Sequence, residues 1–140
     1  MIKKMSIISI FAMLIFLLTG CGNNSEVEED YNAYKELYVS VINEVAPKDS
    51  HDFVIEKLNE KHVVEKIEQM NEIVARMSSN ASTKREKQML SNVLIFNEKL
   101  EFLQYVAKNK DNLTEEERRK YSTEPLDLDR IRQNIEEGEY

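Results

Sequence analysis

Residues that cross-link or interrupt a fold are scarce in this sequence. The 140 residues include only 3 Gly and 2 Pro, which leaves few positions for tight turns and favours long helices. Cys21 is the single cysteine, so the chain cannot form an internal disulfide and has no second thiol for a redox or zinc site. A chain of this length is expected to form one small domain around one hydrophobic core.

Basic residues are also outnumbered beyond the first twenty residues. All 26 acidic residues follow Cys21, whereas Lys3 and Lys4 precede it, so residues 21–140 carry 17 basic residues and a formal charge of −9. Nucleic acid is therefore not expected as a partner, because binding it requires a basic face that neutralises phosphates. The same balance disfavours close docking of the folded part onto anionic lipid headgroups.

The first twenty residues have the three-part layout of a secretory signal. Residues 1–6 contain two lysines and no acidic residue, residues 7–18 are apolar except for Ser9, and the small residues Thr19 and Gly20 follow. As a helix, an apolar run of about 12 residues spans ~18 Å, which is short of the ~30 Å hydrocarbon core of a bilayer. The sequence therefore predicts a removable export signal over residues 1–20 rather than a permanent transmembrane helix.

The signal ends in the stretch Leu18-Thr19-Gly20-Cys21, which resembles the lipobox of bacterial lipoproteins. The resemblance implies cleavage between Gly20 and Cys21 and attachment of lipid to the Cys21 thiol. Bacterial lipoproteins carry at least two acyl chains, and each buried methylene contributes about 0.8 kcal/mol, so such an anchor is durable. The alternative is a secreted protein in which Cys21 has no such role.

A short polar segment connects Cys21 to the folded part. Residues 22–25 are Gly-Asn-Asn-Ser, and an acidic cluster follows at Glu26, Glu28, Glu29 and Asp30. About five extended residues reach at most ~17 Å, so the folded part is expected close to the extracytoplasmic face of the cell membrane. Gly22 stands where many two-membrane bacteria have a retention aspartate, so the choice of membrane stays open, although the precursor resembles those of Gram-positive bacteria. The expected organisation is a signal peptide (1–20), a lipidated tether (21–30) and a single helical domain (31–140).

Hydrophobic periodicity predicts amphipathic helices along the rest of the chain. The first, residues 26–46, ends at Pro47. Its apolar stripe steps alternately by four and three residues and consists of Val27, Tyr31, Tyr34, Tyr38, Val41 and Val45. The second helix is expected from His51 to Met77, ending before Ser78-Ser79-Asn80. Its apolar face consists of Ile55, Leu58, Val63, Ile67, Met70, Ile73, Val74 and Met77.

The third helix opens with a capping box of Thr83 and Glu86, in which each side chain satisfies a backbone N–H of the first turn. Its apolar stripe consists of Met89, Val93, Phe96, Leu100, Leu103 and Ala107. A C-terminal helical appendage is expected over residues 111–140, with a second capping box at Thr114 and Glu117 and an interruption at Pro125. No segment alternates with a period of two residues, so the predicted fold is all-α. The expected architecture is an up-down bundle of three long helices with the C-terminal appendage.

The two histidines lack the neighbours that catalysis or metal binding requires. His51 and Asp52 are adjacent and would point about 100° apart on a helix. No glutamate lies three residues before His51 or His62, as carboxylate metal bundles require. No nucleophile, phosphate-loop or zinc motif is present, so no catalytic residue, metal site or cofactor is predicted.

Four tyrosines offer an aromatic cluster that could hold a ligand. Three of them, Tyr31, Tyr34 and Tyr38, share the apolar stripe of the first helix, whereas Tyr105 lies on the third helix. Packing in the core, with the hydroxyls at its rim, is the favoured interpretation of the three that share a stripe.

A second apolar stripe on the third helix is the candidate partner surface. Ile95, Phe102 and Val106 lie away from the main stripe of that helix, and one packing face cannot cover both. One interpretation is that the C-terminal segment covers this stripe with Leu126, Leu128, Ile131 and Ile135. The other is that the stripe contacts a membrane partner or a second copy in a helix-in-groove arrangement.

These patterns favour a non-enzymatic, membrane-tethered protein-interaction module on the extracytoplasmic face. Accessory, assembly, exclusion and immunity lipoproteins belong to this class, with the membrane bound through lipid on Cys21. The alternative is a small ligand-binding or cell-wall-active lipoprotein with a site between helices.

Overall fold

The computed structural model describes residues 25–45 and 51–140, without the side chains of residues 51–53. The predicted signal, with Gly20 and Cys21, lies outside the described residues. In the described part every regular element is helical, so the prediction of an all-α fold is confirmed. The elements are α2 (Glu26–Val45), α3 (His51–Leu58), α4 (Lys61–Asn80), α5 (Lys84–Asn109), the 3₁₀ helix η1 (Lys110–Asn112), α6 (Glu115–Tyr121) and α7 (Glu124–Glu136).

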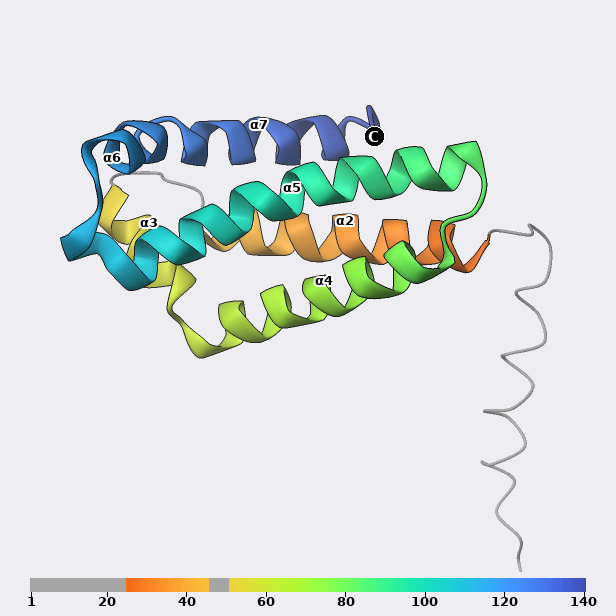
Figure 1. Cartoon of the computed structure of the whole chain (residues 1–140), viewed down its shortest axis with the longest axis horizontal. Coiled ribbons are helices and arrows are strands. Elements are labelled where there is room, and N and C mark those ends of the chain that lie inside the picture. The colour runs from red at the N-terminus through yellow and green to blue at the C-terminus, as the bar shows by residue number, and fades with distance from the viewer. Residues whose placement is uncertain (1–24, 46–50) are drawn as a thin grey trace, which may run out of the picture.

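The four longer helices, α2, α4, α5 and α7, lie side by side and alternate in direction (Figure 1). Helix α2 packs against α4, α5 and α7, and α7 also packs along α5. The start of α2 and the α4–α5 connection lie at one end of the bundle, whereas α3 and α6 lie at the other (Figure 1). None of the described helices is both long enough and apolar enough to cross a bilayer.

The core lies between these helices and contains the stripes that the periodicity predicts. Tyr34 and Tyr38 of α2 are fully buried, and Tyr38 lies 5.6 Å from Phe96 of α5, measured between ring centroids. The other large side chains buried to the same degree are Ile42, Leu58, Ile67, Met70, Met77, Leu100, Leu103 and Leu128. Burial of side chains of this size supplies most of the free energy that holds such a bundle together.

The expectation of one helix from His51 to Met77 is wrong, because the chain turns at Asn59 and Glu60 and divides it into α3 and α4. The physical reason lies in the spacing of two core residues. Leu58 and Val63 are both buried, but they are five residues apart, which on a continuous helix would place them about 140° from each other. The turn at 59–60 allows both side chains to reach the core.

Helix α4 also continues beyond Met77, where Ser78-Ser79-Asn80 was expected to end it. The hydroxyls of Ser78 and Ser79 donate to the carbonyls of Val74 and Ala75, at 2.7 and 3.1 Å. Serine side chains that donate back to the preceding turn are compatible with a helix. The last residue of α4 is therefore Asn80.

Both predicted capping boxes are present. Thr83 accepts from the backbone N–H of Glu86 at the start of α5, and the Glu86 carboxylate accepts from the backbone N–H of Thr83. Thr114 and Glu117 make the same reciprocal pair at the start of α6. These pairs satisfy backbone donors that the first turn leaves without a partner.

The C-terminal segment forms two helices, and Pro125 lies in the first turn of α7 rather than between helices. Proline is compatible with that position because the first backbone N–H groups of a helix have no intrahelical acceptor. The expected three-helix arrangement is therefore not confirmed, since the second segment is divided and α7 packs beside α2 and α5 as a further layer. Gly138, with a φ of 80°, follows the end of α7.

Two buried polar contacts fix α7 on the bundle. The hydroxyl of Tyr38 donates to the carbonyl of Leu128 at 3.2 Å, which joins α2 to α7. Lys99 of α5 donates to the carboxylate of Glu124 at 2.9 Å, and Glu124 is only 4% exposed. A buried carboxylate requires such a cation, so this pair sets the position of α7 relative to α5.

Candidate functional site

Large apolar side chains are exposed along the outer side of α5. The large exposed hydrophobic residues in the described part are Leu94, Ile95, Tyr105, Leu126 and Tyr140, and the first three lie on this one helix. They are 47%, 51% and 44% exposed, respectively, and Phe102 beside them is half-buried. At about 100° per residue, all four α5 side chains fall within an arc of about 100°, so they form one continuous strip.

Glu98 lies at the centre of this strip. It follows Leu94 by four residues and Ile95 by three, and it precedes Phe102 by four, which makes all three its neighbours on the helix surface. Its side chain is exposed and has no hydrogen-bond or ion-pair partner among the described residues. We call the set of Leu94, Ile95, Glu98, Phe102 and Tyr105 the α5 outer face.

The structure separates the three residues of the predicted partner stripe. Ile95 and Phe102 belong to the α5 outer face, but Val106 is fully buried and lies in the core. Val106 is part of the hydrophobic core, although it points in nearly the same direction from α5 as Ile95, eleven residues earlier. Val106 therefore does not contribute to an exposed surface in this structure.

Helix α7 leaves the α5 outer face uncovered. Leu128 and Ile131 are buried and Ile135 is half-buried, so the inner side of α7 is directed toward α2 and the core. Leu126, which was expected to help cover the second stripe, is 67% exposed. The C-terminal segment thus takes part in the core without enclosing Leu94 or Ile95.

Helix α6 borders one end of the α5 outer face. The Nζ of Lys120 lies 4.1 Å from the centroid of the Phe102 ring, a cation–π contact. The Glu117 carboxylate accepts a hydrogen bond from the Tyr105 hydroxyl, and this raises the pKa of Tyr105. The two aromatic residues are therefore held in place by α6, whereas Leu94 and Ile95 have no such neighbour.

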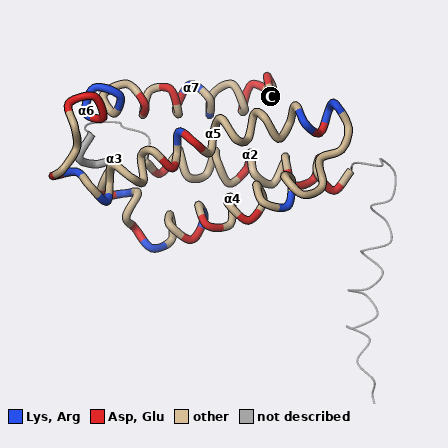
Figure 2. The backbone as a smooth tube through the Cα atoms, viewed as in Figure 1, with Lys and Arg blue, Asp and Glu red and all other residues tan. Residues whose placement is uncertain are grey.

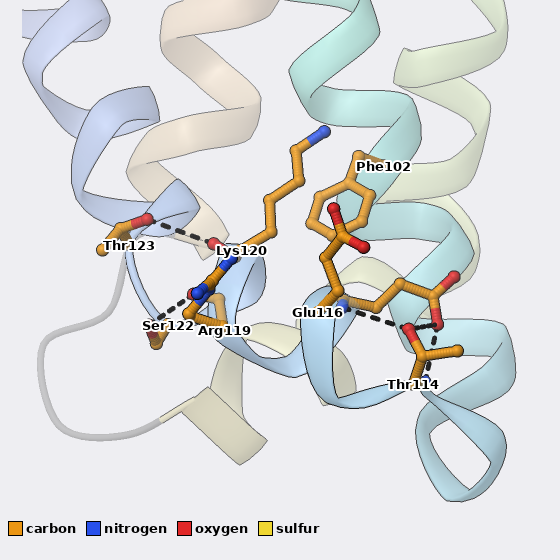
Figure 3. Close-up of a pocket in the computed structure, with 8 residues that line it drawn as sticks. Phe102, Thr114, Glu116, Arg119, Lys120, Ser122 and Thr123 are labelled. Carbon is orange, nitrogen blue, oxygen red and sulfur yellow. Dashed lines mark hydrogen bonds between the residues drawn. The ribbon is translucent and has the colours of Figure 1, made fainter.

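An open hollow of about 680 Å³ lies beside Phe102, between α5 and α6 (Figure 3). Lys120 and Arg119 line it together with Glu116 and Thr114. Sites for small molecules are typically concave and mainly apolar, with a few polar groups. This hollow is open to solvent and lined mainly by polar side chains, so it is better described as an extension of the α5 outer face.

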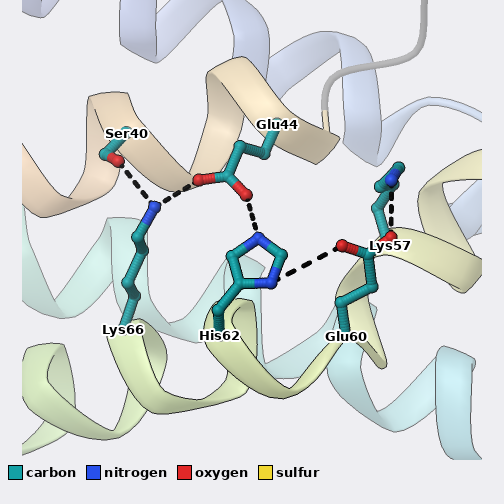
Figure 4. A network of polar contacts seen from close by, with 6 residues as sticks. All are labelled: Ser40, Glu44, Lys57, Glu60, His62 and Lys66. Carbon is teal, nitrogen blue, oxygen red and sulfur yellow. Dashed lines mark hydrogen bonds and ion pairs between the residues drawn. The ribbon is translucent and has the colours of Figure 1, made fainter.

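A second polar cluster joins α2 to α4 (Figure 4). The carboxylate of Glu44 accepts hydrogen bonds from Nζ of Lys66 and Nε2 of His62, and Lys66 also donates to the Ser40 hydroxyl at 3.0 Å. The bond from Lys66 is the main reason why the pKa of Glu44 is lowered. His62 also lies 3.6 Å from Glu60, measured from Nδ1 to Oε2.

This cluster holds α2 and α4 together. The His62 side chain is 53% exposed. Within residues 25–45 and 51–140 no group of three or more His, Cys, Asp or Glu side chains is arranged to hold a metal ion. The side chains of His51 and Asp52 lie outside the description.

Asn97 is a buried polar residue that the periodicity did not indicate. It accepts from the Tyr34 hydroxyl at 3.3 Å and donates to Asn71 and Glu101 at 3.0 and 2.9 Å, so it connects α2, α4 and α5. Burial raises the pKa of Tyr34 far above its usual range, which keeps the hydroxyl protonated as a donor. No buried side-chain polar atom among the described residues lacks a partner, so the group specifies packing rather than chemistry.

Charge does not single out a nucleic-acid surface among the described helices. Each described α-helix contains both acidic and basic residues, and none is basic throughout (Figure 2). Comparisons of the chain with protein-family models, with curated proteins and with solved structures found no match. The candidate site therefore depends on its geometry, and the strongest feature of that geometry is the α5 outer face.

Proposed function

We propose that this protein is a lipid-anchored interaction module on the extracytoplasmic face of a bacterial cell membrane. Lipid on Cys21 holds it at the membrane, and the α5 outer face binds a membrane or surface protein. The observation that carries the proposal is the strip of three exposed apolar side chains on a single helix, Leu94, Ile95 and Tyr105. Apolar strips of this kind on small folded proteins mark contact surfaces.

The position of the strip suits a tethered protein. Helix α2 begins five residues after Cys21, so its start is held within ~17 Å of the lipid. The start of α5 lies at the same end of the bundle (Figure 1). Leu94 is ten residues from Lys84, or about 15 Å along α5. A partner would therefore meet the strip a short distance above the bilayer, where extracytoplasmic parts of membrane proteins lie.

The alternative of a small-ligand site between helices has less support. The interior of the bundle is filled by large side chains, among them Tyr34, Met70 and Leu100. The hollow beside Phe102 is open and mainly polar, unlike a typical ligand pocket. A contact with another protein would account for the exposure of Leu94 and Ile95. A ligand bound in the hollow beside Phe102 would not account for it.

Site-specific crosslinking in the producing cell tests the proposal. A photo-crosslinking amino acid replaces Ile95 in the full chain, and the same residue replaces Gln69, an exposed polar position on α4, as the control. We expect a discrete adduct from position 95 in the membrane fraction and none from position 69. Equal adducts at the two positions, or none at position 95, would remove the α5 outer face as the binding surface.

A further inference from the structure

Any partner that covers the α5 outer face must also cover Glu98. This carboxylate has apolar neighbours on both sides along the helix, Leu94 and Ile95 before it and Phe102 after it. Its side chain is exposed and has no ion-pair partner among the described residues. A partner with a purely apolar surface would remove water from this charge without replacing it, which is costly.

We infer that the partner presents an amphipathic helix with a lysine or arginine within its apolar face, positioned against Glu98. This inference rests on the proposed function and adds the chemistry of the partner. The strip from Leu94 to Tyr105 is about 17 Å long and one helix wide, which is the surface that another helix covers. A lysine or arginine suits the centre because its aliphatic stem packs on apolar neighbours while its cation meets the carboxylate.

A second copy of this chain does not fit the same surface. The antiparallel pairing that matches the two ends of the strip sets Leu94 opposite Tyr105 of the other copy. That pairing also sets Glu98 of each copy opposite Glu101 of the other, which is exposed as well, and like charges in contact are unfavourable.

Sliding the two copies does not solve this conflict. A shift that places Lys87 opposite Glu98 would set Phe102 opposite Thr83 and Tyr105 opposite Asn80. These residues belong to the α4–α5 connection and the end of α4, so the aromatic half of the face would lose its apolar partner. The charge on Glu98 therefore favours a different protein over self-association.

Charge reversal at Glu98 tests the inference in the same cells and with the same crosslinker at position 95. Glu98→Lys is expected to lower the yield of the adduct at least about tenfold, because the lysine would face the cation of the partner. Glu68→Lys, which makes the same change at an exposed position of α4, is expected to leave the yield unchanged. Both positions are exposed and have no partner in the described part of the chain, so both variants are expected to fold, and thermal unfolding of each checks this.

The identity of the adduct provides the second measurement. We expect the crosslinked peptide to come from another protein and to contain lysine or arginine among apolar residues at helical spacing. Changing that basic residue to glutamate is expected to restore the adduct with Glu98→Lys.

The outcomes distinguish the inference from the proposed function. An adduct at position 95 that does not respond to Glu98→Lys, or whose mass is that of two copies of this chain, overturns the inference and leaves the proposed function standing. Absence of any adduct at position 95 in the otherwise native chain overturns both.

Discussion

Ile95 and Val106 point in nearly the same direction from α5, yet Ile95 is 51% exposed and Val106 is fully buried. The difference arises along the helix axis, because Val106 belongs to the hydrophobic core and Ile95 lies outside it. The outer side of one helix therefore contains a core position and a surface position eleven residues apart. The α5 outer face therefore ends before Val106.

Truncation at these two positions should have opposite consequences. Val106→Ala is expected to lower the free energy of unfolding by about 2 kcal/mol, because it leaves a cavity in the core. Ile95→Ala is expected to change it by less than about 0.5 kcal/mol, because that side chain contacts mainly water. Urea unfolding of residues 25–140, followed by circular dichroism, measures both. A large loss for Ile95→Ala would show that the strip is covered within the monomer.

The three threonines at helix starts differ in what their side chains do. Thr83 and Thr114 accept from the backbone N–H of Glu86 and Glu117, respectively, whereas the Thr123 side chain makes no capping bond at the start of α7. Thr83→Ala and Thr114→Ala are each expected to cost about 1 kcal/mol of stability. Thr123→Ala serves as the control and is expected to cost less than half of that. Equal losses in all three variants would contradict the described capping geometry.

Acid should weaken the start of α5 through Glu86. Backbone N–H groups of Thr83 and Ser82 donate to its carboxylate and lower its pKa from 4.5 to about 2. A lowered pKa means that the ionised form stabilises the fold above pH 4.5, and that this contribution is lost as the pH falls toward 2. Glu86→Gln keeps a capping side chain without the titration.

Unfolding experiments between pH 6 and pH 2 compare the native chain with Glu86→Gln. We expect the native chain to be the more stable of the two at pH 6, and the difference to disappear by pH 2. The control is Glu68→Gln, since Glu68 is exposed on α4 and has no partner in the described part. A difference that stays constant over this range would show that the Glu86 carboxylate is not held by the backbone donors.

Local rules that depend on neighbouring residues predicted much of the fold. The stripe through Tyr31, Tyr34 and Tyr38 and the two capping boxes follow from spacing along one helix, and the structure contains them. Contacts between distant segments were harder to predict. Asn97 is buried because it meets Tyr34, which lies 63 residues earlier, and no local pattern indicates such a partner.

Two local features of the sequence indicate parts of the structure that the apolar stripes alone do not. The step of five between Leu58 and Val63 indicates a break in the second helix, because no continuous helix places both on one face. Leu94 and Tyr105 lie on the same side of the third helix as Ile95 and Phe102. A helical wheel at 100° per residue therefore places all four residues in one strip. What the helical wheel could not indicate is that Val106 is buried, since its burial depends on which other elements pack against α5.

We propose that the domain acts from the membrane to which lipid on Cys21 attaches it. The most direct measurement is the intact mass of the protein extracted from cell membranes with detergent, together with incorporation of labelled fatty acid. We expect a chain that begins at Cys21 and exceeds the mass of the bare polypeptide by at least two acyl chains, and we expect Cys21→Ala to abolish the label. An unmodified chain in the membrane fraction, or label that persists in Cys21→Ala, would contradict the account.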